Sequence, residues 1–378
     1  MTRLLLVNAE GADASAGGAE TIVAMLAEGL REREWEVHVL AAFPTAAAPP
    51  APRVTLHRTS WRSSQRRRVL NHVGDLVAAP SPRLRDAVRA ARPQVVHTHN
   101  LPGVSTAVWG IAAAAGARVV HTLHDYYLLC PRVTLFAPSG EPCGRGAFCS
   151  FRSRRLQRWS DAVDDVVAVS DALLARHVGF FPRAREHVIR HPWTPPEESV
   201  LPPGSPPRTI GFLGALEATK GVHVLLDAAP RLRELGYDLR IAGSGRLQGA
   251  VEAAAARFGN VEYAGRVEGE RRSAFLVGCD LGVVPSVWDE PGGPPLTLLD
   301  WLEAGRPVLS SGRGGLAELE GAGGVLVVEP SPDALVHAAL GLRDESAWAR
   351  LCAAVRPPEL PSLAAWLESY ERVLRGDG

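Results

Sequence analysis

One lysine in this sequence has the surroundings of an anion-binding group. Lys220 is the only lysine among 41 basic side chains, and it lies in "GALEATKGV" (214–222), a glycine-bounded turn after an apolar stretch. A compact ammonium close to the start of the following helix suits a diphosphate. A Schiff-base lysine for pyridoxal phosphate and an ordinary surface lysine are the alternatives. The turn is not a Walker A loop. That motif would require glycine in place of Thr219 and serine or threonine in place of Gly221.

A second segment combines an acidic side chain with glycines and the start of a helix. It reads "VPSVWDEPGGPPLTLLDWLEAGRPVLSSGRGGLAE" and spans residues 284–318. Glu290 precedes Gly292 and Gly293, and the next helix is expected to carry Thr297 and Asp300. Exposed backbone N–H groups at such a helix start can hold a phosphate or a sugar, and carboxylates can accept hydrogen bonds from sugar hydroxyls. The segment therefore predicts a cradle for a phosphorylated sugar.

A third motif, "GGAE" (17–20), follows the first apolar run of the chain. Gly17 and Gly18 would let backbone N–H groups approach an anion at the positive end of the next helix. An ordinary tight turn is the alternative. The motif lacks the full G-x-G-x-x-G pattern, so it does not indicate a dinucleotide-binding turn.

Four histidines follow or lie in two neighbouring apolar runs. The first run contains "HTH" (97–99), and the second leads through His121 to His124. His97 and His99 would share one face of a strand, which is the right period for two metal ligands. Histidines that are buried and hydrogen-bonded within a sheet are far commoner, so we favour that reading over a metal site.

Three cysteines lie in the segment "CPRVTLFAPSGEPCGRGAFC" (130–149). Cys130, Cys143 and Cys149 contain no C-x-x-C pair, which makes them a weak signal for zinc or a cluster. A loop stabilised by packing is the interpretation that we prefer.

Short apolar runs alternate with longer amphipathic stretches along the chain, and these elements must position the motifs. Repeated strand–helix–strand order with continuously apolar strands predicts α/β architecture with parallel, doubly wound sheets. A first helix is expected over 19–33. Strands are predicted at 3–8, 36–41, 94–99, 118–123, 165–170, 208–214, 238–243, 260–265, 280–286, 306–311 and 323–329.

A proline-dense segment, "HPWTPPEESVLPPGSPP" (191–207), divides the pattern into two parts. We therefore expect an N-terminal Rossmann-like domain over 1–192, a linker over 193–207 and a C-terminal Rossmann-like domain over 208–359. The last segment, 360–378, is expected to form an amphipathic helix that packs back onto the first domain. Two such domains would face each other across a cleft at the carboxyl ends of their strands, where ligands of these sheets bind.

Composition narrows the classes of function. The formal net charge is zero, so the chain has no bulk attraction for nucleic acid. No run of about 18 apolar residues indicates a membrane span, and the start of the chain is better explained as a strand than as a signal peptide. Five cysteines, an odd number, favour a reducing cytoplasm. The basic clusters at 61–69 and 152–158 are expected to be solvated faces; contact with the inner face of a membrane, or with an anionic acceptor, is the alternative.

Taken together, the motifs resemble those of the retaining GT4-like glycosyltransferases (family 4, group 1), which have the GT-B fold. The resemblance covers nearly the full length and keeps the family's order of motifs. It rests on "GGAE", "VHTHN", "TLHDYYLLCPR", "VVAVSDAL", "GFLGALEATKGVHVLLDA", "IAGSG", "YAGRV" and the 284–318 segment.

The resemblance implies roles for individual residues. Lys220 would contact the diphosphate of a nucleotide-sugar donor, Glu290 the sugar, and His124 would face the reacting sugar. Two departures accompany it: Ala215 stands where relatives often carry an arginine beside the phosphate, and Asp300 replaces a second glutamate. The donor-binding positions implied by the resemblance are Gly17, Gly18, Gly214, Arg266, Gly292, Gly293, Leu296, Thr297 and Asp300.

The implied reaction moves a sugar from a nucleoside diphosphate, UDP or GDP, to a hydroxyl acceptor with retention. No D-x-D triplet occurs in the sequence, so we expect no metal and no other cofactor, with Lys220 taking the role of a divalent cation. A polysaccharide, a lipid-linked sugar or a natural product are the acceptors considered. A nucleotide-sugar epimerase, a phosphorylase and a binding protein that has lost catalysis remain the competing interpretations.

Overall fold

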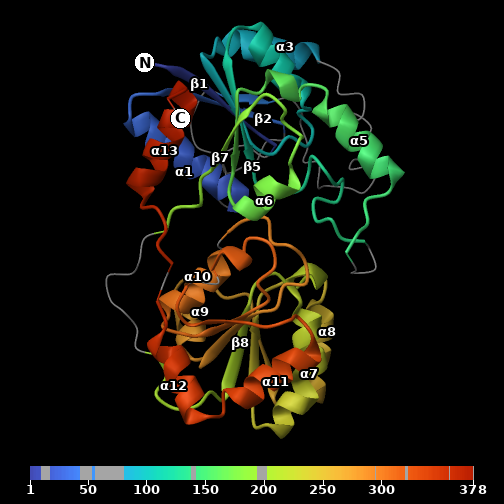
Figure 1. Cartoon of the computed structure of the whole chain (residues 1–378), viewed down its shortest axis with the longest axis vertical. Coiled ribbons are helices and arrows are strands. Elements are labelled where there is room, and N and C mark those ends of the chain that lie inside the picture. Colours follow the sequence, from blue (N-terminus) through green and yellow to red (C-terminus); the bar gives the residue numbers. More distant parts are fainter. Residues whose placement is uncertain are drawn as a thin grey trace. The chain divides into compact units, whose positions relative to one another are not determined.

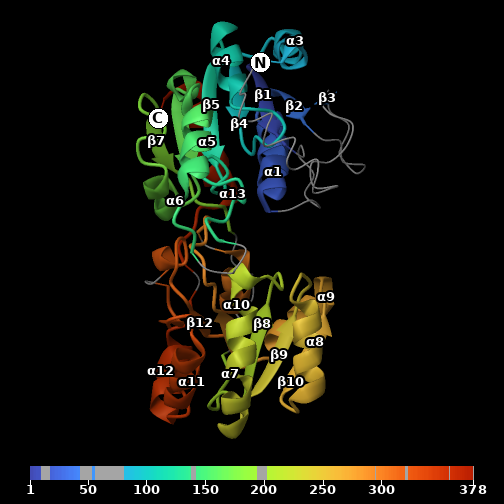
Figure 2. The same ribbon diagram turned by 90° about the vertical axis from the view of Figure 1, so that its right-hand side faces the viewer.

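The computed structural model describes residues 1–9, 18–42, 81–137, 142–193, 202–293, 295–319, 322–356 and 358–377, and the backbone alone of 53–55. The chain divides into two compact units. Unit 1 comprises Met1–Leu135, Cys143–Pro192 and Pro361–Gly378, and unit 2 comprises Phe136–Pro142 and Trp193–Leu360. Figures 1 and 2 show that each unit is built around its own sheet.

Unit 1 contains a seven-stranded sheet with the order β3-β2-β1-β4-β5-β6-β7. All six neighbouring pairs are parallel. The central strands are continuously buried, as expected when helices cover both faces of a sheet. The strands are β1 (Arg3–Asn8), β2 (Glu36–Ala41), β3 (Arg53–Thr55), β4 (Val95–Thr98), β5 (Arg118–Leu123), β6 (Asp165–Ala168) and β7 (Arg185–Val188).

The helices of unit 1 lie on opposite faces of this sheet. Along β4 the side chains alternate: the ring of His97 lies 5.6 Å from that of Tyr370 in α13, whereas Thr98 Oγ1 accepts a hydrogen bond from Trp109 of α4 at 2.9 Å. The helices are α1 (Gly18–Glu32), α3 (Pro82–Ala91), α4 (Ala107–Ala114), α5 (Ala147–Gln157), α6 (Asp171–Arg176) and α13 (Leu363–Arg375), with a 3-10 turn at Ser160–Ala162.

The C-terminal helix α13 is part of the core of unit 1. Trp366 and Tyr370 are fully buried in a cluster that also contains side chains of α1 and β1. At Gly29 of α1 a Cβ atom would lie 2.5 Å from the side chain of Leu367, so the two helices approach closely there. Figure 1 shows α13, in red, running beside α1, in blue. Segments from the two ends of the chain thus build one domain core.

Unit 2 contains a six-stranded parallel sheet with the order β10-β9-β8-β11-β12-β13. Its strands are β8 (Thr209–Leu213), β9 (Asp238–Ala242), β10 (Val261–Gly265), β11 (Leu281–Val284), β12 (Val308–Ser310) and β13 (Val325–Val327). Its helices are α7 (Val222–Glu234), α8 (Gln248–Arg257), α9 (Gly269–Val277), α10 (Leu296–Glu303), α11 (Pro332–Gly341) and α12 (Glu345–Ala353). The predicted fold class, two doubly wound α/β domains, is confirmed.

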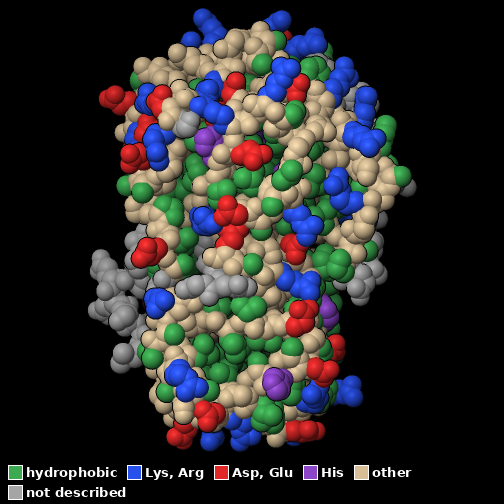
Figure 3. Space-filling model, in the orientation of Figure 1, with side chains coloured by type: hydrophobic (Ala, Val, Ile, Leu, Met, Phe, Trp, Pro, Cys, Tyr) green, Lys and Arg blue, Asp and Glu red, His purple; other side chains and the backbone are tan. Residues whose placement is uncertain are grey.

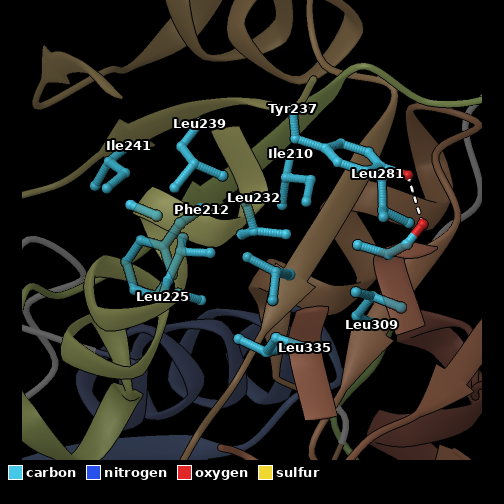
Figure 4. Close-up of a cluster of buried hydrophobic side chains, with 14 of the residues drawn as sticks. Ile210, Phe212, Leu225, Leu232, Tyr237, Leu239, Ile241, Leu281, Leu309 and Leu335 are labelled. Atoms are coloured by element: carbon cyan, nitrogen blue, oxygen red, sulfur yellow. Dashed lines mark hydrogen bonds between the residues drawn. The ribbon is translucent and has the colours of Figure 1, made fainter. Parts of the chain in front are cut away.

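The core of unit 2 packs β8, β9 and β11 against α7 and α11 (Figure 4). Ile210 and Leu281 are almost completely buried. The Tyr237 hydroxyl donates to the carbonyl oxygen of Ala339 at 2.7 Å, the hydrogen bond drawn as a dashed line in Figure 4. Burial raises the pKa of Tyr237 to about 12, so the hydroxyl stays protonated and remains a donor.

Two strands of unit 1 are absent from the prediction, and both are at an edge of the sheet. β7 has the sequence REHV and its side chains are exposed or half-buried, so it lacks the apolar run that marks a central strand. β3 has only three residues. Edge strands are commonly short and charged, which makes them hard to recognise from periodicity.

The surface carries no strong separation of charge on the face shown in Figure 3, where basic and acidic side chains are intermixed. This distribution matches the zero net charge. In the part of the chain that is described, no helix has the length and apolar character needed to cross a bilayer.

Candidate functional site

In unit 2 the fold brings together Lys220 and Glu290. Lys220 ends a 3-10 turn (Ala218–Lys220) that follows β8, and Glu290 lies in the loop between β11 and α10. The Lys220 ammonium donates to both carboxylate oxygens of Glu290, at 2.7 and 2.8 Å. The Glu290 side chain is only 5% exposed, whereas that of Lys220 is 33% exposed. A buried carboxylate is therefore balanced by a cation that still reaches solvent.

Two further groups define the surroundings of this ion pair. Ser286, four residues before Glu290, donates its hydroxyl to Glu290 Oε1 at 2.5 Å. The Lys220 ammonium lies 5.4 Å from the centre of the Trp288 ring, within the range of a cation–π contact. The carboxylate is held from two sides and the ammonium lies over an aromatic ring, so both groups have defined positions.

The turn that carries Lys220 is anchored to the segment before Glu290 by a glycine. Gly221 has a φ of 73°, and a Cβ atom there would lie 1.8 Å from the carbonyl oxygen of Pro285. The adjacent Val287 N–H donates to the Thr219 carbonyl at 3.0 Å. Only glycine permits this approach, since any side chain would collide with the backbone. The chain thereby places Lys220 beside a loop 70 residues further on.

The loop at Glu290 is held by a second backbone crossing. The Gly315 N–H donates to the Glu290 carbonyl at 2.8 Å, and the Glu290 N–H donates to the Arg313 carbonyl at 3.3 Å. A Cβ atom at Gly315 would lie 2.3 Å from the carbonyl oxygen of Gly292. Gly293 is buried next to this crossing. The "GRGG" run (312–315) thus fixes the backbone from which Glu290 projects.

The predicted donor residues of α10 lie at its first two turns. Leu296 is its first residue and is 56% exposed, Thr297 is half-buried, and Asp300 forms an ion pair with Arg272 of α9. Burial raises the pKa of Asp300 above its ordinary value, and the guanidinium of Arg272 offsets this only in part. Asp300 already pairs with Arg272, so a ribose hydroxyl that binds Asp300 would have to share the carboxylate with that arginine.

The remaining predicted donor residues are spread over both units. Gly214 directly follows β8, and its N–H donates to the carbonyl oxygen of Ala242 at 3.1 Å. Arg266 follows β10, is largely exposed and pairs with Glu268 at 2.6 Å. Gly18 is the exposed first residue of α1 in unit 1, and Gly17 lies outside the described residues.

In unit 1 the predicted sugar-facing residue, His124, follows β5 and belongs to a cluster of histidines. His99 Nδ1 and His124 Nε2 are 2.9 Å apart, and the His191 ring stacks with that of His124 with 6.2 Å between centres. His97 contacts His99 with 4.2 Å between ring centres, and its Nε2 bonds Thr122 Oγ1 at 2.8 Å. The histidines of the two runs therefore bond other groups of the sheet, as we expected for buried strand histidines.

Burial keeps these imidazoles neutral. It lowers the pKa of His97 to about 3 and that of His191 to about 4, and it lowers those of His99 and His124 well below the ordinary value. No group of three or more histidine, cysteine or acidic side chains among the described residues has a geometry suited to a metal ion. Cys130, Cys143 and Cys149 are all free thiols.

Three residues around the predicted site were missed by sequence reasoning. Ser286 could have been found, because it precedes Glu290 by four residues within the same motif. Arg272, the partner of Asp300, and His191, which stacks on His124, gave no signal in the sequence. Each lies 28 or more residues from its partner in the chain, and only the packing within its own unit brings the two together.

Two family models match the chain. The model named Glycosyltransferase Family 4 matches residues 16–192, and the model named Glycosyl transferases group 1 matches residues 207–345. An uncharacterized 42.6 kDa protein in the cps region of Klebsiella pneumoniae is 27% identical over 335 residues, which are 84% of this chain and 87% of that protein.

Solved structures share the fold over the whole length. Sucrose-phosphate synthase from Thermosynechococcus elongatus superposes with a TM-score of 0.70 at 17% identity, covering 100% of this chain and 99% of that one. The Anabaena protein HepE, solved in complex with UDP and glucose, has a TM-score of 0.65 at 18% identity and full coverage of both chains.

Proposed function

The chain belongs to the group 1 glycosyltransferases of the GT-B fold, and we propose that it transfers a sugar from a nucleoside-diphosphate sugar to a hydroxyl acceptor with retention of configuration. The observation that carries this proposal is the pair formed by Lys220 and the buried Glu290. The pair lies in the segments that follow β8 and β11. Its cation can reach a diphosphate, and its carboxylate can accept hydrogen bonds from sugar hydroxyls.

The donor is proposed to bind unit 2. Lys220 contacts its diphosphate, Glu290 its sugar and Asp300 its ribose. The relative HepE was solved with UDP and glucose, which supports a UDP-sugar, and a GDP-sugar is the second choice. Further contacts to the donor are assigned to Gly214, Arg266, Gly292, Gly293, Leu296 and Thr297 of unit 2, and to Gly17 and Gly18, which belong to unit 1.

The transition state resembles an oxocarbenium ion, and negative charge builds on the departing diphosphate. Lys220 stabilises that charge, because an ammonium already held in position need not reorganise when the charge develops. In this scheme the reaction needs no metal, and the lysine takes the role of a divalent cation. His124 contacts the reacting sugar and orients it for attack by the acceptor hydroxyl. The transferred group is proposed to be a hexose, and the acceptor a polysaccharide, a lipid-linked sugar or a natural product.

We also propose a cytoplasmic location with contact to the inner face of the membrane through α5. Phe148 and Phe151 are 55% and 56% exposed, and Arg154 and Arg158 lie exposed beside them. Aromatic side chains next to arginines suit the interface of an anionic bilayer. Co-sedimentation with phosphatidylglycerol vesicles, but not with phosphatidylcholine vesicles, should be lost in Phe148→Ser/Phe151→Ser. The exposed Leu340 provides the control: Leu340→Ser should bind as the unchanged protein does.

The donor is best found by thermal stabilisation with a panel of nucleotide sugars, since a ligand that binds the folded state raises its apparent stability. The stabilising donor is then supplied with candidate acceptors in EDTA, and NMR of the product gives the anomeric configuration. Transfer with retention supports the proposal. Conversion of the donor without an acceptor would indicate an epimerase. Pyridoxal absorbance, with the pyridoxal group attached to Lys220 after borohydride reduction, would indicate a phosphorylase. Binding without transfer or hydrolysis of the donor would indicate a protein that has lost catalysis.

A further inference from the structure

The contact between His99 and His124 constrains where each ring holds its proton. His99 Nδ1 and His124 Nε2 are 2.9 Å apart, and the rings are nearly stacked, with 5.2 Å between centres. Two ring nitrogens at this distance form a hydrogen bond only if one carries a proton and the other presents a lone pair. Two arrangements satisfy this condition, and they give His124 opposite chemical properties.

Both rings are neutral, so each carries a single proton. Burial lowers the pKa of His99 most, and the neighbouring His97, His124 and His121 lower it further. Burial also dominates at His124, where His191, His121 and His97 add to the effect. A protonated pair would place a charge inside a group of imidazoles that offers no carboxylate among the neighbours named here.

The environment of His99 selects between the two arrangements. His99 is 1% exposed, and its other nitrogen, Nε2, is buried with no hydrogen-bond partner in the described part of the chain. If His124 donated, the proton of His99 would lie on Nε2 and be an orphaned buried donor. If His99 donates from Nδ1, Nε2 is only an unused acceptor, and buried acceptors are left unsatisfied more often than buried N–H groups.

We infer that His99 donates from Nδ1 to His124 Nε2 and so holds His124 in the tautomer that carries its proton on Nδ1. His99 is itself held in place, because His97 packs against it with 4.2 Å between ring centres and bonds Thr122. Thr122, His97 and His99 thus form a chain of contacts that ends on the ring of His124. His99 is a positioning residue that acts through His124.

The tautomer decides what His124 can do. His124 is partly exposed, and with Nε2 engaged by His99 it presents only an N–H group to a ligand. Such a ring donates a hydrogen bond to a sugar oxygen and cannot serve as a general base from that nitrogen. This inference rests on the proposed function only in assuming that His124 contacts the sugar; the assignment of the protons does not depend on it.

The protons can be observed directly by NMR. Two-bond nitrogen–proton correlations of the ¹⁵N-labelled full chain distinguish protonated from unprotonated ring nitrogens, and His124→Gln and His99→Asn assign the signals. We expect His124 to show protonated Nδ1 and unprotonated Nε2, and His99→Leu to release this constraint. The control variant His121→Leu removes another buried strand histidine but leaves the bond between His99 and His124 in place, so the tautomer of His124 should stay the same. A protonated Nε2 in His124, or an unchanged His124 ring in His99→Leu, would overturn the inference.

Kinetics provide a second readout. His99→Leu should lower kcat about tenfold with little change in the donor KM, by analogy with the loss of a residue that orients a ligating histidine. His99→Asn, whose amide can donate from near the position of Nδ1, should recover most of kcat. Equal losses in both variants would contradict positioning through this hydrogen bond. If His124→Gln itself kept full activity, the proposed role of His124 would fail, while the NMR result would still decide the tautomer. If His99→Leu does not fold, the spectrum of the unchanged protein still shows which nitrogen of His124 carries the proton, and the kinetics of His99→Asn still test the positioning role.

Discussion

The ammonium of Lys220 lies 2.7 and 2.8 Å from the two carboxylate oxygens of Glu290, although 70 positions separate the residues in the chain. The contact ties the turn after β8 to the loop after β11. A donor diphosphate would therefore meet a lysine that is already oriented, and part of the ordering cost is met before binding. The pair is the main support for the proposal that the donor binds unit 2.

The ion pair should be visible in the stability of unit 2. Lys220→Ala leaves a carboxylate that is 5% exposed without its cation, which we expect to lower the free energy of unfolding by about 1–3 kcal/mol. Glu290→Gln removes the buried charge and should reduce that loss, so the double variant should cost clearly less than the sum of the single variants. Urea unfolding of the four proteins measures the cycle. Additivity within about 0.5 kcal/mol would show that the two side chains do not interact.

The close approach at Gly221 predicts a sharp sensitivity to a single methyl group. Gly221→Ala would place Cβ 1.8 Å from the Pro285 carbonyl at a φ of 73°, so the turn must shift and donor affinity should fall together with stability. The matched control is Gly249→Ala in α8, where nothing lies within 4 Å. That variant should raise the free energy of unfolding by about 0.5–1 kcal/mol. Calorimetric titration with the nucleotide measures donor affinity in the two variants, and thermal melts measure their stability. Equal affinity and equal stability in Gly221→Ala and Gly249→Ala would contradict the close contact between Gly221 and Pro285.

The buried histidines predict that acid weakens unit 1. In the unfolded chain a histidine takes up a proton near pH 6.5, whereas burial lowers the folded pKa of His177 to about 4 and of His97 to about 3. The unfolded state therefore binds more protons below pH 6.5. The contribution to stability is complete above that pH and is lost as pH falls toward the folded pKa, by up to about 1.4 kcal/mol per pH unit for each histidine.

Urea midpoints between pH 7 and pH 4 test this dependence. His177→Asn should flatten it, since an asparagine amide can replace the bond between His177 Nδ1 and the Leu173 carbonyl without titrating. Asp165 acts at lower pH: burial alone would raise its pKa, but His187, Arg118 and Arg185 together lower it, so its contribution fades only below the ordinary range of a carboxyl. A midpoint that stays constant from pH 7 to pH 5 would contradict the neutral histidines.

The architecture could be predicted because its signals are local. The central strands are short apolar runs, and helical segments separate several of them, so the order of elements and the parallel sheets could be inferred directly. β7 was missed because its side chains are exposed or half-buried and form no apolar run, and β3 was missed because it has only three residues. The last helix, α13, which we expected to pack back onto the first domain, lies in the core of unit 1 and contacts α1 from the other end of the chain.

The candidate site was predictable in its residues but not in its contacts. Lys220 and Glu290 could be singled out from their motifs, whereas their direct pairing depends on two backbone crossings, at Gly221 and Gly315. The pairing of Asp300 with Arg272 and the stacking of His191 on His124 join elements with no common motif. Such contacts follow from the packing of neighbouring elements, which a single sequence does not encode locally.

The central claim is that Lys220 stabilises the departing diphosphate of a nucleotide-sugar donor. Its most direct test is the transfer rate of Lys220→Ala with the donor selected by thermal stabilisation, compared with Arg231→Ala, which removes an equal charge from α7. We predict that Lys220→Ala lowers kcat by about 10²–10³, equivalent to about 2.7–4 kcal/mol of transition-state stabilisation, and that Arg231→Ala keeps the rate. A near-normal transfer rate in a folded Lys220→Ala protein would contradict the account.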